Sequence, residues 1–401
     1  LWMGRRDVTE NETRLFHAGA QAFLKFKGTK LDVTINNCCV WGSLNLGVVI
    51  DGEMKGIPLS HDNNCKDVTL TVAENLADGE HSAIIYKRHA GNQYLFIKAF
   101  ETDGEFVAPD ALPERKIEVY GDSVCAGEVI EAYDYVAQCD PEGHDSKFDN
   151  VWNSFVMQTA RNIDAQIHNI CQGGIALFDK TGYFHMPDCI GLESTYDKTC
   201  YFPEGGDITT WDFSKYIPDI VIIAIGQNDQ HNAVTDQNDR NISDPVYRNE
   251  WKTAYIKMVR DLDQKYNGTK FVLTTTILMH DVDWDNAIEE IKNELNGMGI
   301  KAYHNMFSRN GAATPGHPRL SEHNEMAEEL TKFIKENGDF HVSGACYPEC
   351  HLEASSLAED IKHLKEKVDA GADFLTTQMV FDNNLFFSFL SKLRDAGVNC
   401  P

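Results

Sequence analysis

Two residue types that perform nucleophilic catalysis stand in short motifs far apart in the chain. Ser123 lies in Tyr120-Gly121-Asp122-Ser123-Val124, directly after an apolar run that predicts a β-strand, and His317 lies in Gly316-His317-Pro318 ahead of an amphipathic stretch. A serine hydroxyl is a weak nucleophile until a neighbouring base takes its proton. At the end of a strand in a parallel sheet, Ser123 is placed for such an attack. The alternative is a serine that caps the following helix and a histidine that is incidental to its loop.

Two further motifs offer hydrogen-bond donors to a developing negative charge. Cys171-Gln172-Gly173-Gly174-Ile175 and Gly226-Gln227-Asn228-Asp229 each follow an apolar strand. Glycine lets backbone N–H groups approach an oxyanion closely, and asparagine adds an amide donor at the same edge of the sheet. Each motif by itself is also compatible with an ordinary turn.

Together the four motifs resemble the four sequence blocks of the SGNH (GDSL-type) hydrolases. The resemblance implies that Ser123 is the nucleophile and that His317 acts as general base and then as general acid. It also implies an oxyanion hole made by the backbone N–H groups of Ser123 and Gly174 and by the Asn228 side chain, with Gly173 as the alternative to Gly174.

One position departs from that pattern. Many SGNH hydrolases have an aspartate three residues before the histidine, where this sequence has Thr314. A β-sandwich followed by a catalytic domain without this aspartate resembles carbohydrate esterase family 2, over residues 4–337. That resemblance implies a Ser-His dyad whose imidazole is held by a backbone carbonyl. It further implies an acyl-enzyme route that removes O-acetyl groups from plant polysaccharides such as acetylated xylan or mannan, without a metal or cofactor.

Other polar residues near these motifs are expected to be structural. Cys125 has no base of its own and is expected to be a packed thiol, while Asp122 and Asp229 are expected to be turn carboxylates. His231 follows Asn228 closely and is a candidate for substrate contact. The aspartates at 281, 283 and 285 resemble a calcium loop but lack its glycine and distal glutamate, which favours a solvated turn.

Aromatic residues are frequent between residues 178 and 211, a segment that fits neither helix nor strand periodicity. Sugars are bound by flat apolar faces, so some of these rings should line a cleft while others pack the segment onto the domain. Trp211 and Trp284 are the two candidates for a binding platform.

Two kinds of periodicity divide most of the chain. Over residues 1–113, short alternating runs are separated by Asp-Gly pairs at 51–52, 78–79 and 103–104, which predicts hairpins in an antiparallel β-sandwich of the jelly-roll type. Over residues 114–337, strands at 117–120, 167–171, 220–225 and 270–277 alternate with helices at 151–163, 245–266, 285–298 and 324–336. This alternation predicts an α/β domain with a parallel sheet covered by helices on both faces.

Residues 338–401 form a third region with a βαβα pattern. Its helices are predicted at 356–370 and 384–396, and a strand at 374–378. The stretches 346–351 and 367–373 resemble methylenetetrahydrofolate reductase, which implies flavin positions at Tyr347, Asp360 and Lys367 and a folate position at Gln378. A (β/α)8 barrel needs about 250 residues. We therefore expect a fragment without flavin or reductase activity, and no metal site.

Composition narrows the classes of partner. The 401 residues carry a formal net charge of −26, which repels nucleic acids and anionic membranes, and no apolar run approaches the ~20 residues that cross a bilayer. Among the 11 cysteines, Cys189 and Cys200 bracket a short loop and could pair in an oxidising compartment. The chain does not begin with Met, and we expect a trimmed, secreted protein that acts on acetylated polysaccharide or oligosaccharide.

Three other functions stay open at this stage. The same fold also serves lipid and thioester hydrolases, although no apolar lid sequence is evident. A carbohydrate-binding protein with an inactive catalytic domain is a second alternative. A folate-linked flavoprotein, suggested by the C-terminal region, is the third.

Overall fold

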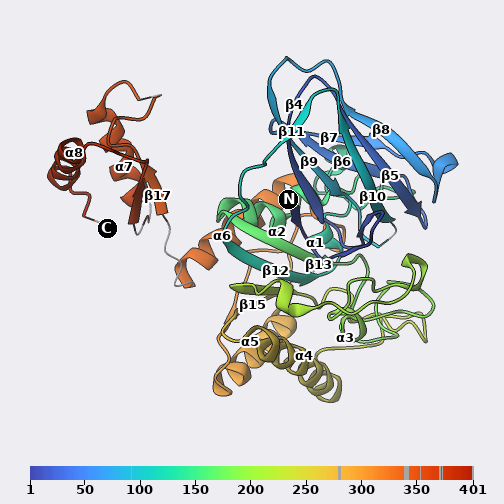
Figure 1. Cartoon of the computed structure of the whole chain (residues 1–401). Helices are drawn as coiled ribbons and strands as arrows, with labels where there is room; N and C mark the ends of the chain where they lie inside the picture. The colour runs from blue at the N-terminus through green and yellow to red at the C-terminus, as the bar shows by residue number, and fades with distance from the viewer. Residues whose placement is uncertain are drawn as a thin grey trace. The chain divides into compact units, whose positions relative to one another are not determined.

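Strands dominate the first part of the chain and alternate with helices after it, as the computed structural model shows (Figure 1). The structure describes residues 1–91, 93–278, 281–337, 343–352, 354–369, 372 and 374–399. Residues 1–333 form one compact unit and residues 334–401 form a second.

The N-terminal region consists of two antiparallel sheets. One contains, in spatial order, β1 (Trp2–Met3), β4 (Gln21–Lys27), β9 (Glu80–Lys87), β6 (Asn45–Ile50) and β7 (Glu53–Pro58), with β11 (Glu105–Val107) also paired to β4. The other contains β2 (Arg6–Val8), β3 (Thr13–Leu15), β10 (Gln93–Thr102), β5 (Leu31–Cys39) and β8 (Asp67–Ala73). Alternate residues of β5 are buried in a core shared by the two sheets. The antiparallel sandwich is therefore as predicted, and the jelly-roll type stays a prediction.

Only one of the three Asp-Gly pairs closes a hairpin. Asp51-Gly52 joins the paired strands β6 and β7. The other two pairs lie where the chain passes from one sheet to the other, between β8 and β9 and between β10 and β11, so the hairpins predicted there are wrong. Asp103 instead accepts hydrogen bonds from the backbone N–H groups of Thr29 and Lys30, which ties two loops together.

The next region contains a five-stranded parallel sheet. Its order is β13 (Ala165–Cys171), β12 (Arg115–Gly121), β14 (Ile220–Ala224), β15 (Lys270–Thr274) and β16 (Ala302–His304). Helices α2 (Phe155–Asn162) and α6 (Leu320–Asn337) lie on one side of this sheet, and α4 (Pro245–Tyr266) and α5 (Val282–Gly297) on the other (Figure 1). The short helices are α1 (Ser123–Ala126), α3 (Leu192–Thr195) and the 3-10 turns His61–Asn63, Tyr133–Tyr135, Val151–Asn153, Pro203–Gly205 and Phe213–Lys215.

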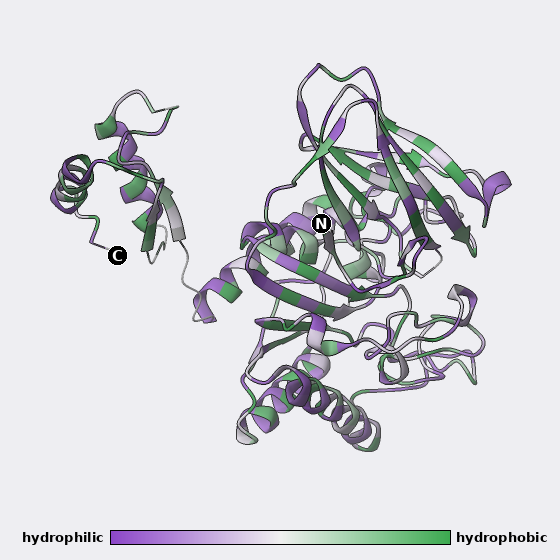
Figure 2. Ribbon diagram, viewed as in Figure 1, coloured by the Kyte–Doolittle hydropathy of each residue, from purple (hydrophilic) through white to green (hydrophobic). Residues whose placement is uncertain are grey.

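The helices follow the predicted pattern with shifted ends. Helix α4 has the predicted bounds, because Asp244 caps its start and Asn267 ends it in a left-handed conformation. Helix α5 begins earlier than predicted, because Asp281 accepts hydrogen bonds from the N–H groups of Asp283 and Trp284. The solvated turn predicted at this acidic stretch is therefore wrong. In Figure 2, α4 and α5 alternate hydrophilic and apolar residues, as helices with one buried face do.

A buried ion pair joins the sandwich to the parallel sheet. Arg5 follows β1 and donates to Glu118 of β12 at 2.9 Å, and both side chains are fully buried. Tyr120 and Tyr266 also donate to the Glu118 carboxylate. The guanidinium further donates to the backbone oxygen of Tyr196 at 2.7 Å, so every part of this charge cluster has a partner.

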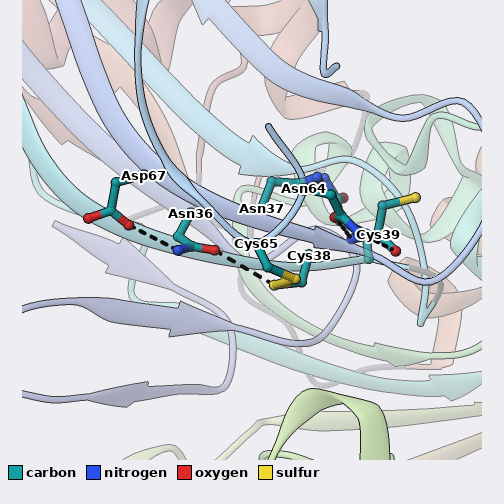
Figure 3. Close-up of a disulfide and its surroundings, with 8 residues drawn as sticks. Asn36, Asn37, Cys38, Cys39, Asn64, Cys65 and Asp67 are labelled. Carbon is teal, nitrogen blue, oxygen red and sulfur yellow. Dashed lines mark hydrogen bonds between the residues drawn. A yellow bond between two sulfur atoms is a disulfide. The ribbon is translucent and has the colours of Figure 1, made fainter. Parts of the chain in front are cut away.

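The disulfide lies in the sandwich and not where pairing was expected. Cys38, near the end of β5, is bonded to Cys65 (Figure 3). Cys189 and Cys200 are unpaired, and their buried thiols donate to the carbonyl oxygens of Gly182 and Phe202. The considered Cys189–Cys200 pair is therefore a wrong expectation.

The second unit follows the predicted βαβα pattern. It contains β17 (Ser343–Cys346), α7 (Leu357–Asp369), β18 (Phe374–Thr377) and α8 (Asn383–Asp395). The two strands pair in parallel, and a small apolar core includes Ile361, Leu364 and Phe389. In the part of the chain that the structure describes, no helix is both long and apolar enough to cross a membrane.

Candidate active site

Ser123 lies just beyond the carboxyl end of β12, the second strand of the parallel sheet in spatial order. It is the first residue of α1, and Asp122 caps this helix by accepting the N–H of Val124 at 3.1 Å. The turn is tight, since a Cβ atom on Gly121 would lie 2.4 Å from the Cys125 sulfur. This crowding explains why glycine ends β12 and why the serine follows in a fixed position.

His317 reaches Ser123 from the segment before α6. Its Nε2 lies 2.8 Å from Ser123 Oγ, and its Nδ1 lies 2.6 Å from Asp140 Oδ2. Asp140 comes from the long loop after α1. The sequence predicted a backbone carbonyl as the partner of Nδ1, and this is wrong, because a carboxylate occupies that place and completes a Ser-His-Asp arrangement.

Asp140 is itself held from two sides. Its Oδ1 accepts the backbone N–H of His317 at 3.1 Å and the Arg319 guanidinium at 2.9 Å. The same guanidinium donates to the carbonyl oxygen of His317 at 2.5 Å. The Arg319 side chain is buried, so its charge is shielded from solvent. The result is a fixed carboxylate whose second oxygen faces the imidazole.

Charge at the site follows from these contacts. Burial raises the pKa of Asp140, but the hydrogen bonds and charges of His317 and Arg319 outweigh burial and hold that pKa below its ordinary value. Burial lowers the pKa of His317, but the Asp140 hydrogen bond and charge outweigh it, so the imidazole pKa is raised. Asp140 therefore stays ionised and strengthens His317 as a base.

The two predicted donor motifs lie beside Ser123. Gly174 adopts φ +73°, a conformation that favours glycine, and among the described residues its N–H has no intramolecular partner. The Asn228 amide donates to the Ile175 carbonyl at 3.0 Å and makes only a long contact of 3.4 Å with Asp122. Its second hydrogen can therefore be given to a ligand. Ser123, Gly173, Gly174, Asn228 and His317 all line one cavity.

The neighbouring polar residues have structural partners. Asp122 is the helix cap, and Asp229 accepts the N–H of Leu177 at 3.0 Å and the Trp251 indole at 2.7 Å. Both are turn carboxylates, as predicted, and Cys125 is a buried thiol. His231 lines the cavity and stacks on Tyr183 with ring centroids 4.1 Å apart.

The cavity has a volume of ≈ 730 Å³ and is open to solvent. One part of its wall is the insertion predicted between residues 178 and 211, with Tyr183, Phe184, His185 and Met186. Another part is the sandwich loop that carries Val40 and Trp41, and the Trp41 side chain is 54% exposed. The sandwich and the parallel-sheet region therefore both contribute residues to the cavity wall.

The two tryptophans predicted as a sugar platform are not in this cavity. Trp284 is fully buried on α5 and packs edge-on against Trp251. Trp211 is 6% exposed and lies under the Arg5 guanidinium, 5.5 Å from its ring centroid. Both belong to the hydrophobic core, so the predicted platform is wrong, and Trp41 is the tryptophan that faces the cavity.

The Trp41 loop is fastened at its start. Cys38 is bonded to Cys65, and the Asn64 side chain pairs with both backbone groups of Cys39 at 2.6 and 3.2 Å (Figure 3). The Cys39 thiol donates to the Trp41 carbonyl at 3.2 Å. These contacts fix the loop where it meets the cavity.

Comparisons with known proteins agree with the fold and the site described above. Residues 2–110 match the family model of the carbohydrate esterase 2 N-terminal domain, and residues 261–401 match that of methylenetetrahydrofolate reductase. The chain resembles the family 2 carbohydrate esterases. Both resemblances predicted from the sequence are therefore confirmed.

Individual relatives agree with the family model. The chain is 27% identical over 347 residues to the cellulase/esterase CelE of Acetivibrio thermocellus, covering 84% of this chain and 39% of that protein. It is 26% identical over 348 residues to an acetylxylan esterase / glucomannan deacetylase of Cellvibrio japonicus, covering 84% and 88%. The chain thus spans well under two thirds of the first relative.

A solved structure extends the likeness to three dimensions. A family two carbohydrate esterase from Clostridium thermocellum in complex with cellohexaose is similar with a TM-score of 0.69 and 26% identity. The match covers 84% of this chain and 98% of that one. It confirms the predicted SGNH-hydrolase fold, a parallel sheet covered by helices, for the esterase-like part.

Proposed function

We propose that this chain is a serine esterase that removes O-acetyl groups from acetylated polysaccharides or their oligosaccharides. The observation that carries the proposal is the 2.8 Å hydrogen bond between His317 Nε2 and Ser123 Oγ, with Asp140 on the far nitrogen of the imidazole. The similarity to carbohydrate esterases over 84% of the chain supports the class of substrate.

The reaction has two halves. Ser123 Oγ attacks the acetyl carbonyl carbon while His317 Nε2 takes the hydroxyl proton, and the carbonyl oxygen becomes an oxyanion. The N–H groups of Ser123 and Gly174 and the Asn228 amide stabilise that oxyanion. The intermediate collapses, the sugar oxygen leaves with the proton from His317, and an acetyl-serine remains. Water then attacks the acetyl-serine by the same route and releases acetate.

Asp140 takes no proton in this scheme. Its carboxylate keeps the Nδ1–H of His317 in place, so that Nε2 faces Ser123 without a hydrogen, and it stabilises the imidazolium that forms. The mechanism therefore uses a carboxylate-supported imidazole in place of the dyad that the sequence implied.

The remaining expectations extend the proposal. We propose an accessory sandwich over residues 1–113, a catalytic domain over 114–337, and a C-terminal reductase-like segment over 338–401 without reductase activity. We also propose that the protein acts outside the cell. Absence of flavin absorbance in the purified chain, even after incubation with FAD, would support the proposal for the C-terminal segment, and stable flavin binding would overturn it.

The direct test is acetate release. The wild-type chain should release acetate from acetylated xylan or acetylated glucomannan and hydrolyse 4-nitrophenyl acetate, and Ser123→Ala should do neither. Release of acetate by Ser123→Ala at the wild-type rate would refute the proposed chemistry. Hydrolysis of a long-chain 4-nitrophenyl ester in preference to the acetate would refute the proposed substrate.

A further inference from the structure

Glu128 is an acid in the catalytic cavity that the proposed chemistry does not use. It lies five residues after Ser123 in the sequence and lines the same cavity as Ser123, Asn228 and His317. The structure shows no hydrogen bond from its carboxyl group to another described residue, and the side chain is partly exposed to the cavity. A carboxyl group that is partly exposed in the cavity beside a nucleophile is available to a ligand.

The backbone around Glu128 is strained. Val129 has φ +56°, which is rare for a β-branched residue. Gly127, which ends α1, has φ +71°, a conformation that glycine adopts without strain. Hydrogen bonds impose this conformation, since the N–H of Glu128 donates to the Ser123 carbonyl at 3.0 Å and that of Val129 to Asp149 at 2.9 Å. Strain that is held in place by several contacts is typical of functional sites, and here it fixes the position of Glu128.

The carboxyl group also lies directly against the second donor motif. A Cβ atom on Gly173 would lie 1.7 Å from Glu128 Oε1, so any larger residue at 173 would displace the acid. Gly173 is the neighbour of Gly174, whose N–H is proposed to bind the oxyanion. Glu128 therefore lies next to the place where the ester carbonyl is expected.

The carboxyl group is suited to donate a hydrogen bond. Burial, followed by the charge of Asp149, raises the pKa of Glu128 to about 8. Near neutral pH most of the population is then protonated and carries an O–H donor together with a carbonyl acceptor. A neutral acid of this kind suits a sugar hydroxyl, which both donates and accepts.

We propose that Glu128 is a specificity-determining residue that binds a free hydroxyl of the same sugar that carries the acetyl ester. This inference rests on the proposed esterase function and adds a preference within it. A sugar with a free neighbouring hydroxyl is positioned by Glu128, whereas a fully acetylated sugar has no hydroxyl to offer.

The test compares two substrates. Methyl β-xyloside carrying one acetyl group has free hydroxyls, and the fully acetylated methyl β-xyloside has none. The measured quantity is the ratio of kcat/KM for the two substrates in the wild type, Glu128→Ala, Glu128→Gln and the exposed control Glu114→Ala. A tenfold change corresponds to about 1.4 kcal/mol, which lies within the range of one hydrogen bond. We therefore expect Glu128→Ala to reduce the wild-type preference for the monoacetate about tenfold, chiefly through KM.

The other variants separate this role from a structural one. Glu128→Gln keeps an N–H donor and a carbonyl acceptor and should keep most of the preference, as should Glu114→Ala. If Glu128→Ala does not fold, Glu128→Met fills the same volume without hydrogen bonding and takes its place. An unchanged preference in the apolar variants, or an equal loss on both substrates, would overturn the proposal.

A failure of the proposed function gives a different result. In that case the wild-type chain would hydrolyse neither xyloside, or Ser123→Ala would hydrolyse both. A loss of preference as large in Glu128→Gln as in Glu128→Ala would overturn the proposed role of Glu128 and would leave the proposed esterase function untouched.

Discussion

Asp140 accepts a hydrogen bond from the Nδ1 of His317 at 2.6 Å, although the two residues lie 177 positions apart in the chain. The first prediction follows from this contact. Asp140→Asn should lower kcat by about 10²- to 10⁴-fold, because an amide no longer stabilises the imidazolium or enforces the correct tautomer. The exposed residue Asp78 provides a matched control, and Asp78→Asn should keep wild-type turnover.

The same variant should change the pH profile. His317 acts as a base only when neutral, and Asp140 raises the imidazole pKa, so wild-type kcat/KM falls as the pH drops through that raised value. Without the carboxylate the pKa of His317 falls, and the acidic limb of the profile should move to lower pH. A limb that stays in place would contradict the electrostatic role of Asp140.

Asn228→Ala tests the proposed oxyanion hole. Loss of one donor should lower kcat for 4-nitrophenyl acetate by about two to three orders of magnitude, because the donor acts on charge that develops in the transition state. KM should change little. Circular dichroism and gel filtration should match the wild type, and near-normal turnover would remove Asn228 from this role.

Trp41 and Trp284 should respond in opposite ways to truncation. Trp41→Ala should raise KM for an acetylated xylo-oligosaccharide about two- to tenfold, since a stacking ring contributes about 0.5 to 1.5 kcal/mol, and Trp41→Phe should restore most of the binding. Trp284→Ala should lower the free energy of unfolding by about 3 to 5 kcal/mol, because it empties a fully buried site on α5. An unchanged KM for Trp41→Ala would exclude the sandwich loop from substrate binding.

The disulfide should stabilise the sandwich and the Trp41 loop together. It closes a separation of 27 residues, and loss of such a crosslink costs about 2 to 4 kcal/mol. Reduction should therefore lower Tm and raise KM for the oligosaccharide. A variant with both Cys38→Ser and Cys65→Ser should show the lower Tm from the start and should not respond to reductant.

Glu128 should make stability depend on pH. Its pKa in the folded chain is raised to about 8 from an ordinary value of 4.5. The stability that it contributes is fully present below pH 4.5 and is lost as the pH rises through 8. The glutamine of Glu128→Gln does not ionise. The Tm of this variant should therefore rise relative to that of the wild type as the pH increases from about 5 to about 9. A constant difference in Tm over this range would contradict the raised pKa.

The features of the fold and the site that were predictable from the sequence depend on short local motifs. Ser123, Gly174 and Asn228 each follow a strand of the parallel sheet, and parallel strands bring their carboxyl ends to one edge, so short motifs were enough to group them. Helix α4 begins and ends at residues that cap helices in any context. Its bounds therefore required no knowledge of the tertiary structure.

Asp140 and Trp41 carried no such signal. Asp140 lies in a loop without periodicity among several other acids, and nothing in its neighbours distinguishes it from a solvated carboxylate. Trp41 lies in a sandwich loop whose approach to the parallel sheet depends on how the two regions pack. Only the three-dimensional arrangement brings either residue to the cavity.

Trp284 carries a helical signal in the sequence that its acidic neighbours obscure. Its acidic neighbours suggested an exposed loop, yet Trp284, Ile288, Ile291 and Leu295 follow the spacing of one buried helix face. That spacing, continued toward the N-terminus, places Trp284 on the buried face and leaves Asp281 as the helix cap.

The Arg5–Glu118 pair makes the sandwich an integral part of the first compact unit and not a separable domain. Deleting the N-terminal strands would remove the cation that pairs with Glu118, an acid buried on β12, the strand that leads to Ser123, and would also remove Trp41. A shortened form of this chain should therefore be cut elsewhere, or Glu118 should first be replaced by an apolar residue of similar size.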